Sequence, residues 1–192
     1  MRRKCLAVCV AAALTAGCWA HVGVRIPDLP PAAREPGEEL ALQVNDAGLL
    51  WGDGRLGDEV ARVLLASGRF TRVHYPVIPR DRPPLLLRID VKGSLNEAVA
   101  WGVLASVATG FFLFAPAPFM PYFTDLELRG SAALTRADEE LERFPIESDA
   151  HVTHAIFAPP ETYRAKARER VYAAVANQVL IEIGKAAWGP GP

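Results

Sequence analysis

The sequence predicts an α+β domain, and three observations predict this class. Short segments in which apolar and polar residues alternate, as in half-buried strands, recur between residues 40 and 157. Two further segments, residues 56–64 and 161–187, repeat their apolar residues at helical spacing instead. The length of 192 residues suits one domain with a core of its own. We expect that domain to span residues 38–188, with a disordered tail at residues 189–192.

The chain begins with the three parts of an export signal, in residues 1–17. A basic start is followed by a short apolar run, which ends in small residues up to Gly17. That run is far shorter than the about 20 residues of a bilayer-spanning helix. With Cys18 it resembles the signal peptide and lipobox of a bacterial lipoprotein. The resemblance implies cleavage between Gly17 and Cys18, and lipidation of Cys18; an ordinary signal peptide with an incidental cysteine is the alternative.

Cysteine usage agrees with a lipidated terminus. Cys5, Cys9 and Cys18 all lie at or before the cleavage site, so the mature chain would hold one thiol, itself acylated. The sequence therefore predicts no disulfide and no thiolate metal site. Several acyl chains on one residue anchor a protein stably, since each buried methylene contributes about 0.8 kcal/mol. Trp19, rather than Asp, favours the outer membrane by the enterobacterial sorting rule, with the domain facing the periplasm; the inner membrane and the cell surface are alternatives.

Between the cleavage site and residue 97 we expect a tether and four elements. Residues 18–37 hold four prolines and few large apolar residues, which predicts an extended tether. Beyond it, Asp53 is placed to cap a helix and Gly68 to stop it. The expected elements are a strand at Leu40–Val44, a helix from Asp53 to Gly68, and strands at Phe70–Tyr75 and Leu85–Val91.

No charged residue occurs from Ala98 to Thr124. A helix over residues 98–114 would be about 25 Å long, short of a hydrocarbon core of about 30 Å. Spanning a membrane here would also leave two halves, each too small to bury a core. We therefore expect residues 98–123 to be an apolar insert between neighbouring strands, lying at the lipid surface. A buried helix and a transmembrane helix are the alternatives. The expected membrane contacts are Trp101, Phe111, Phe112, Phe114, Phe119 and Tyr122.

The last third of the chain predicts a hairpin, one more strand and a long helix. The residues from Phe123 to Thr135 alternate as a strand with one wet face, and a polar turn at 136–140 leads into a partner strand. The helix follows two prolines and has apolar residues at steps of four. The remaining elements are strands at Leu141–Ile146 and Ala150–Phe157, and a helix from Glu161 to about Ala187.

One stretch, Val60–Val73, resembles the helix-to-strand passage of envelope lipoproteins, in which an apolar helix ends in Ser-Gly and a strand begins with Phe and Val. In outline, residues 38–187 are similar to the amino-terminal domain of the TolB translocation protein and to lipoproteins of curli secretion, synthase activation and lipopolysaccharide assembly. The resemblance implies an antiparallel sheet of four to five strands with two helices packed on one face. It also implies a docking module rather than an enzyme.

The mature chain offers little recognisable chemistry. Gly52, Gly54 and Gly57 have the spacing of a dinucleotide loop, but no acidic residue follows about 20 positions on, so a turn before the helix is the better interpretation. His151 and His154 lie in a segment predicted to be extended, where a spacing of three places them on opposite faces. No serine has the surroundings of a nucleophile. We expect no catalytic residue, no metal and no cofactor.

The net charge and the distribution of charged residues along the chain indicate which classes of partner the protein can bind. Without residues 1–17 the chain has 18 basic against 22 acidic residues, which argues against nucleic acid. Residues 69–92 carry six basic and two acidic residues, whereas residues 138–149 carry six acidic and one basic. These runs are interpreted as solvated faces; the alternative is that one end of the domain favours anionic lipid and the other avoids it.

The sequence thus predicts an outer-membrane lipoprotein that acts as a non-catalytic docking or assembly module for another envelope protein. A second hypothesis is lipid or lipopolysaccharide handling, in which the insert receives an acyl chain and Arg80, Arg82, Arg88 and Lys92 meet phosphates. A third, an envelope hydrolase, lacks a nucleophile.

Overall fold

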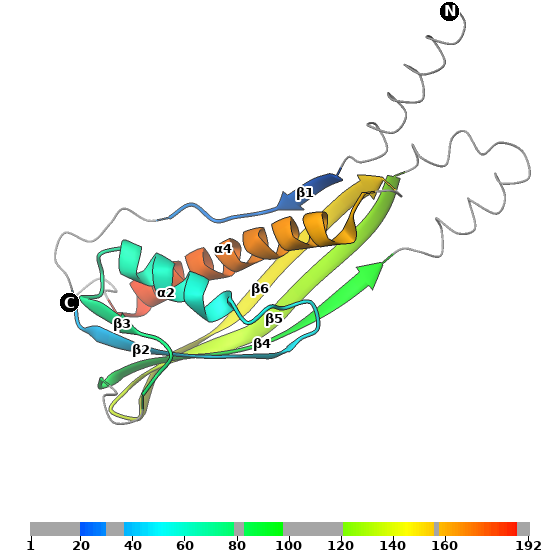
Figure 1. Ribbon diagram of the computed structural model, residues 1–192. Helices are drawn as coiled ribbons and strands as arrows, with labels where there is room; N and C mark the ends of the chain where they lie inside the picture. The colour runs from blue at the N-terminus through cyan, green and yellow to red at the C-terminus, as the bar shows by residue number, and fades with distance from the viewer. Residues whose placement is uncertain (1–19, 30–36, 79–82, 98–120, 156–157, 188–192) are drawn as a thin grey trace, which may run out of the picture.

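The computed structural model describes residues 20–29, 37–78, 83–97, 121–155 and 158–187. The predicted signal peptide (1–17) and tail (189–192) lie outside these residues. Within them the chain forms a six-stranded sheet and two helices (Figure 1). In chain order the elements are β1 (Ala20–Val24), β2 (Glu39–Leu49), α2 (Leu56–Ala66), β3 (Arg72–His74), β4 (Leu85–Glu97), β5 (Pro121–Arg136), β6 (Glu139–Ala155) and α4 (Pro160–Ala187).

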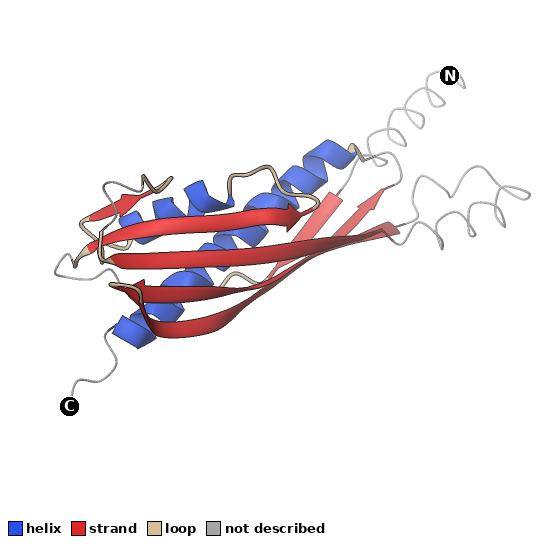
Figure 2. Ribbon diagram, turned by 90° about the horizontal axis from the view of Figure 1, so that it is seen from below, coloured by secondary structure: helices blue, strands red, loops and turns tan. Residues whose placement is uncertain are grey.

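The strands lie in the order β1-β6-β5-β4-β2-β3, and α2 and α4 pack side by side on one face of the sheet. Figure 2 shows the other face, which no described helix covers. The predicted α+β fold with two helices on one face is confirmed. The sheet is mostly antiparallel, but β2 runs parallel to both β3 and β4. Helix α2 provides the crossover that lets β3 run parallel to β2.

The segment predicted as an extended tether contains the sixth strand. β1 pairs with β6 from Ala20 opposite His154 to Val24 opposite Ala150, and Val22 is only 2% exposed. Arg170 of α4 donates a hydrogen bond to the Val22 carbonyl (2.6 Å). Further on, Asn177 donates to the carbonyl of Pro27 (2.9 Å). The prediction of a free tether is therefore wrong for residues 20–29, because this stretch is hydrogen-bonded to the sheet and to α4.

Helix α2 begins at Leu56 and not at the predicted cap Asp53. Gly54 adopts a positive φ of 76°, and Asp53 accepts a hydrogen bond from the backbone N–H of Arg55 (3.2 Å), so this carboxylate stabilises the turn before the helix. The segment that contains Gly52, Gly54 and Gly57 therefore forms a turn before the helix, as interpreted from the sequence. At the other end Gly68 has a φ of 69°, which confirms the predicted stop.

The predicted hairpin is confirmed, with longer strands. Its turn consists of Ala137 and Asp138, with φ of 48° and 68°, the two-residue geometry that matches the right-handed twist of paired strands. The separate strand predicted from Ala150 is wrong, since β6 continues unbroken to Ala155. The apolar face predicted for the last helix is confirmed. Its residues Ala167, Val171, Val175, Val179 and Ile183 are all buried against the sheet.

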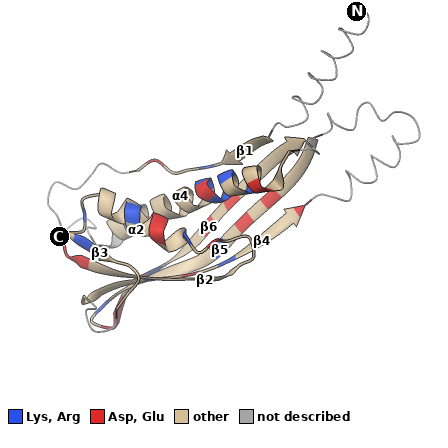
Figure 3. Cartoon of the chain, in the orientation of Figure 1, with Lys and Arg blue, Asp and Glu red and all other residues tan. Residues whose placement is uncertain are grey.

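Opposite charges meet at one end of the molecule and are not separated. Leu85, at the start of β4, lies opposite Arg136, at the end of β5, and the N–H of Ala137 donates to the carbonyl of Pro84 (2.9 Å). This pairing brings the basic segment 69–92 beside the acidic turn of the hairpin. The alternative of two ends with opposite charge is therefore wrong. Figure 3 shows basic and acidic residues interspersed over strands and helices, as the interpretation of solvated faces requires.

Neither helix in the described parts of the chain is both long and apolar enough to cross a bilayer.

Candidate functional site

Four strand ends meet at one end of the sheet, which we call the anchor end. It is formed by Ala20 of β1, Glu97 of β4, Pro121 of β5 and Ala155 of β6 (Figure 1). The strand register brings them together, because Tyr122 lies opposite His154, His154 opposite Ala20, and Thr124 opposite Glu97. The chain from Cys18 therefore enters the domain at this end.

The apolar segment leaves the domain at the same end. It joins β4 to its antiparallel neighbour β5, so the prediction that it connects neighbouring strands is confirmed. β5 already begins at Pro121, and the last three residues of the predicted insert therefore belong to the sheet.

The anchor end has its own packing of rings. His154 stacks between Tyr163 of α4, at 4.1 Å between ring centroids, and Tyr122 of β5, at 6.1 Å. Its Nδ1 lies 3.1 Å from the carbonyl oxygen of Ala155 and its Nε2 3.1 Å from the hydroxyl of Thr124. A ring with the proton on Nδ1 satisfies both, since Nδ1 then donates and Nε2 accepts from the hydroxyl.

The opposite face of the sheet differs at this end. Phe123 stacks on His151 at 5.4 Å and is 41% exposed, and Nδ1 of His151 lies 2.5 Å from Oδ1 of Asp125. His151 and His154 thus lie on opposite faces, as their spacing predicted. Across the described parts of the chain, no group of three His, Cys, Asp or Glu residues is arranged to hold a metal ion.

Among the predicted site residues, the structure describes Tyr122, which is half-buried in β5 beside His154. Its predicted contact with the membrane stays a prediction. The other predicted site residues, Gly17, Cys18, Trp101, Phe111, Phe112, Phe114 and Phe119, lie outside the described residues.

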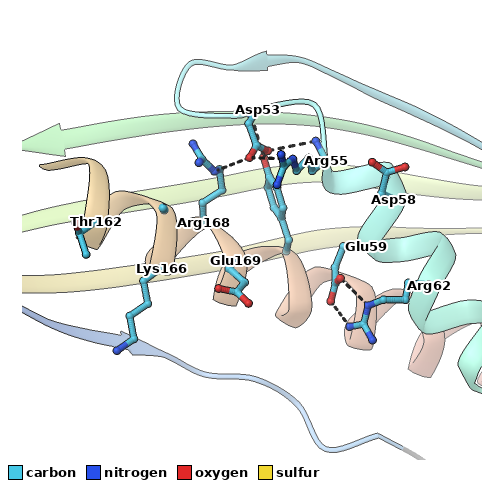
Figure 4. A pocket seen from close by; sticks show the side chains of 11 residues that line it. Asp53, Arg55, Asp58, Glu59, Arg62, Thr162, Lys166, Arg168 and Glu169 are labelled. Carbon is cyan, nitrogen blue, oxygen red and sulfur yellow. Dashed lines mark hydrogen bonds and ion pairs between the residues drawn. The ribbon is translucent and has the colours of Figure 1, made fainter.

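A second candidate site is a pocket of about 610 Å³ between α2 and α4 (Figure 4). Four acidic and four basic side chains line it, and several of them pair with one another. Asp53 forms an ion pair with Arg168, with 3.1 Å between Oδ2 and Nε, and Glu59 forms an ion pair with Arg62 at 2.5 Å. In Figure 4, Arg55 and Arg168 converge on Asp53, whereas Lys166 points away.

Hydrogen bonds and ring contacts of this network connect the loop after β2 to α4. Tyr172 donates a hydrogen bond to Oδ1 of Asp53 (3.2 Å), and Arg168 donates to the carbonyl of Trp51 (3.2 Å). The indole of Trp51 stacks on Tyr172 at 6.1 Å and donates to the carbonyl of Ser94 (3.1 Å). Gly93 leaves room for it, since a Cβ there would lie 2.8 Å from the indole nitrogen. We interpret the pocket as the seam of this structural network.

The same network makes stability depend on pH. Burial raises the pKa of Tyr172 to about 12; the carboxylate of Asp53 adds to this rise, whereas the hydrogen bond from the backbone N–H of Asp53 and the charge of Arg168 oppose it. The folded state thus holds this proton more tightly than the unfolded chain, whose tyrosines titrate near pH 10. The resulting stabilisation is complete below about pH 10 and is lost as the pH rises toward about 12.

We expect the unfolding free energy to fall by about 1–2 kcal/mol more in the native protein than in Tyr172→Phe between about pH 9 and about pH 12. This is less than the full shift would give, because the pocket is open to solvent. Urea unfolding of both proteins across this range measures the difference. Parallel pH profiles would contradict this role for Tyr172.

No family model and no curated protein sequence matches this chain. Several solved structures are similar in chain path. The minor lipoprotein from Acinetobacter baumannii is 13% identical with a TM-score of 0.44, and the match covers 76% of this chain and 91% of that one. Lipoprotein B from Nitrosomonas europaea is 15% identical with a TM-score of 0.39, covering 80% and 85%. The PelC dodecamer from Paraburkholderia phytofirmans gives 12% and 0.34, covering 82% and 96%. The chain is thus similar in structure to bacterial lipoproteins, at low sequence identity.

Proposed function

We propose that this protein is a lipoprotein of the outer membrane, facing the periplasm, that serves as a non-catalytic docking or assembly module for another envelope protein. One observation carries the membrane part of the proposal. The segment from Cys18 enters, and the uncharged segment 98–120 leaves, at the same anchor end of the sheet. Two segments suited to lipid, far apart in the sequence, therefore start from one place on the domain.

The distance from the anchor to the domain is short. Ala20 is already paired with β6, and only Trp19 separates it from Cys18. Two residues of extended chain reach about 7 Å. Acyl chains on Cys18 would therefore hold the anchor end against the bilayer surface, and a protein partner would have to come to the membrane to meet this domain.

Two features support docking over lipid handling. On its side away from β4, strand β2 pairs with β3 through Glu39–Ala41 alone among the described residues, so backbone groups beyond Ala41 could accept an added strand. Of the basic residues proposed for phosphate binding, the two that the structure describes do not form a purely basic surface. Arg88 and Lys92 are exposed on β4 with Asp90 between them, and Arg80 and Arg82 lie outside the described residues.

Cys18→Ser tests the proposal, and Cys9→Ser is its matched control because Cys9 lies in the apolar run of the signal. In Cys18→Ser we expect processing by the lipoprotein pathway to fail, fatty-acid labelling to disappear and the protein to leave the outer-membrane fraction of a density gradient. Cys9→Ser should behave as the native protein does. Crosslinking in cells followed by mass spectrometry should then identify an envelope protein partner for the anchored form.

Two results would count against the proposal. Unchanged processing, fractionation and detergent partitioning of Cys18→Ser would remove the anchor. Crosslinking that recovers lipid but no protein from the anchored form would favour lipid handling over docking.

A further inference from the structure

We propose that the anchor end is itself a lipid-contacting surface, so that the domain stands upright on the bilayer with the β5–β6 turn as its farthest point. This inference rests on the proposed anchor at Cys18 and adds the orientation of the domain. Its occupant is the headgroup region of the bilayer, and its described residues centre on Tyr122, Phe123 and Thr153.

The first argument is where the chain leaves the described part of the molecule. After cleavage between Gly17 and Cys18, the lipidated Cys18 and Trp19 precede Ala20, and 23 residues without a charge separate Glu97 from Pro121. Both stretches are attached at the anchor end, at neighbouring strand ends. If both enter the headgroup region, two separate attachments constrain the tilt of the domain, which a single lipidated residue cannot do.

The second argument is the chemistry of this end. Tyr122 and Phe123 are aromatic, and Phe123 is 41% exposed although it packs on His151. Rings that combine an apolar body with a polar neighbour suit the membrane–water interface. Of the charged residues close by, Arg164 of α4 and Glu97 of β4 form an ion pair with each other, and the carboxylate of Asp125 lies against His151, so these charged groups keep a polar partner in contact with lipid.

An orientation in which the domain lies flat, with the uncovered face of the sheet against the bilayer, is disfavoured. Lying on that face would press many charged side chains into the interface, at a large desolvation cost. They occupy alternate positions on the three neighbouring strands β4, β5 and β6, between the buried residues that pack beneath the helices. These residues are Arg88, Asp90, Lys92, Asp125, Glu127, Arg129, Arg143, Glu147 and Asp149.

Strand length sets the height of an upright domain. β5 has 16 residues and β6 has 17, and both run from the anchor end to the turn at Ala137 and Asp138. At about 3.3 Å per residue the path along each strand is about 50 Å, and because both strands curve (Figure 1), the turn would stand at most that far from the lipid. The exposed acidic residues at this turn would then be the part of the domain that faces the periplasm.

Depth-dependent fluorescence quenching tests the orientation. The lipidated protein is reconstituted into vesicles of phosphatidylethanolamine and phosphatidylglycerol that contain nitroxide-labelled lipid. Because Cys18 is blocked by its thioether, one introduced cysteine at a time can carry a fluorophore. The three positions are exposed or half-exposed and lie at the anchor end, about two thirds of the way along β5 and beside the turn: Asn96→Cys, Ser131→Cys and Glu139→Cys.

We expect the label at residue 96 to lose most of its fluorescence, and the labels at residues 131 and 139 to keep theirs. Phe123→Ser should reduce the quenching at residue 96, whereas the control Leu141→Ser, which alters another exposed large side chain near the turn, should not. Equal quenching at residues 96 and 131 would overturn the upright orientation in favour of the flat one.

Absence of quenching at residue 96 in protein that stays bound to the vesicles would overturn the lipid-contacting surface and leave the proposed anchor intact. Failure of the lipidated protein to associate with vesicles would instead overturn the proposed function, and this inference with it.

Discussion

Gly130→Ala is expected to destabilise the domain by about 3 kcal/mol or more, the upper range for adding a methyl group to a packed interior. Gly130 lies in β5 opposite Val91 of β4. A Cβ at this position would overlap the carbonyl oxygen of Asp90 and lie 2.8 Å from the Cα of Val91. Both are backbone atoms of the neighbouring strand, so no side chain can turn aside and the ladder itself would have to shift.

Gly23→Ala is the matched control, because it places the same methyl group on a strand without crowding. At Gly23 the nearest atom to a new Cβ is the carbonyl oxygen of His151, at 3.6 Å, an ordinary contact. We expect a change within about 0.5 kcal/mol in this variant. Chemical denaturation of the two proteins measures the contrast, and similar midpoints would show that β4 and β5 are not so closely apposed.

The second large effect is expected for Leu128→Ala, at about 2–5 kcal/mol. Leu128 is fully buried in β5, between Gly93 of β4 and Ser148 of β6, and its side chain belongs to the core beneath the helices. Its removal leaves a cavity that the central strands cannot close without disturbing both ladders. The same measurement applies.

Leu141→Ala removes the same atoms from a position that is 47% exposed, near the turn of the hairpin, and should cost well under 1 kcal/mol. If Leu141→Ala lowered the free energy of unfolding as much as Leu128→Ala does, the turn would have to pack against another molecule in solution.

Local patterns predicted the elements whose signal lies within a few residues. The alternation from Leu126 to Leu134, the turn after it and the steps of four from Ala167 to Ile183 each reflect one wet and one buried face, and the structure has all three. Two errors arose where the pattern is short or misleading. β1 has only five residues beside a proline-rich stretch, and Asp53 is a residue type favoured at helix caps but lies two residues before the observed cap, Arg55.

Pairing between distant segments could not be predicted in the same way. Nothing local states that β2 runs parallel to β4, or that Asp53 meets Tyr172, 119 positions away. The candidate site divides along the same line. Cys18 can be recognised in the sequence because its motif consists of adjacent residues. The anchor end is formed by the register of four strands, which only the structure reveals.

The single residue between Cys18 and the edge strand β1 has a consequence for how the protein would find its partner. A lipid anchor so close to the domain would keep the domain at the membrane surface. Its effective concentration would be high for molecules in the same membrane and negligible for molecules beyond its reach. Its encounters with a partner would then be limited by lateral diffusion in the membrane and by the number of copies in the leaflet.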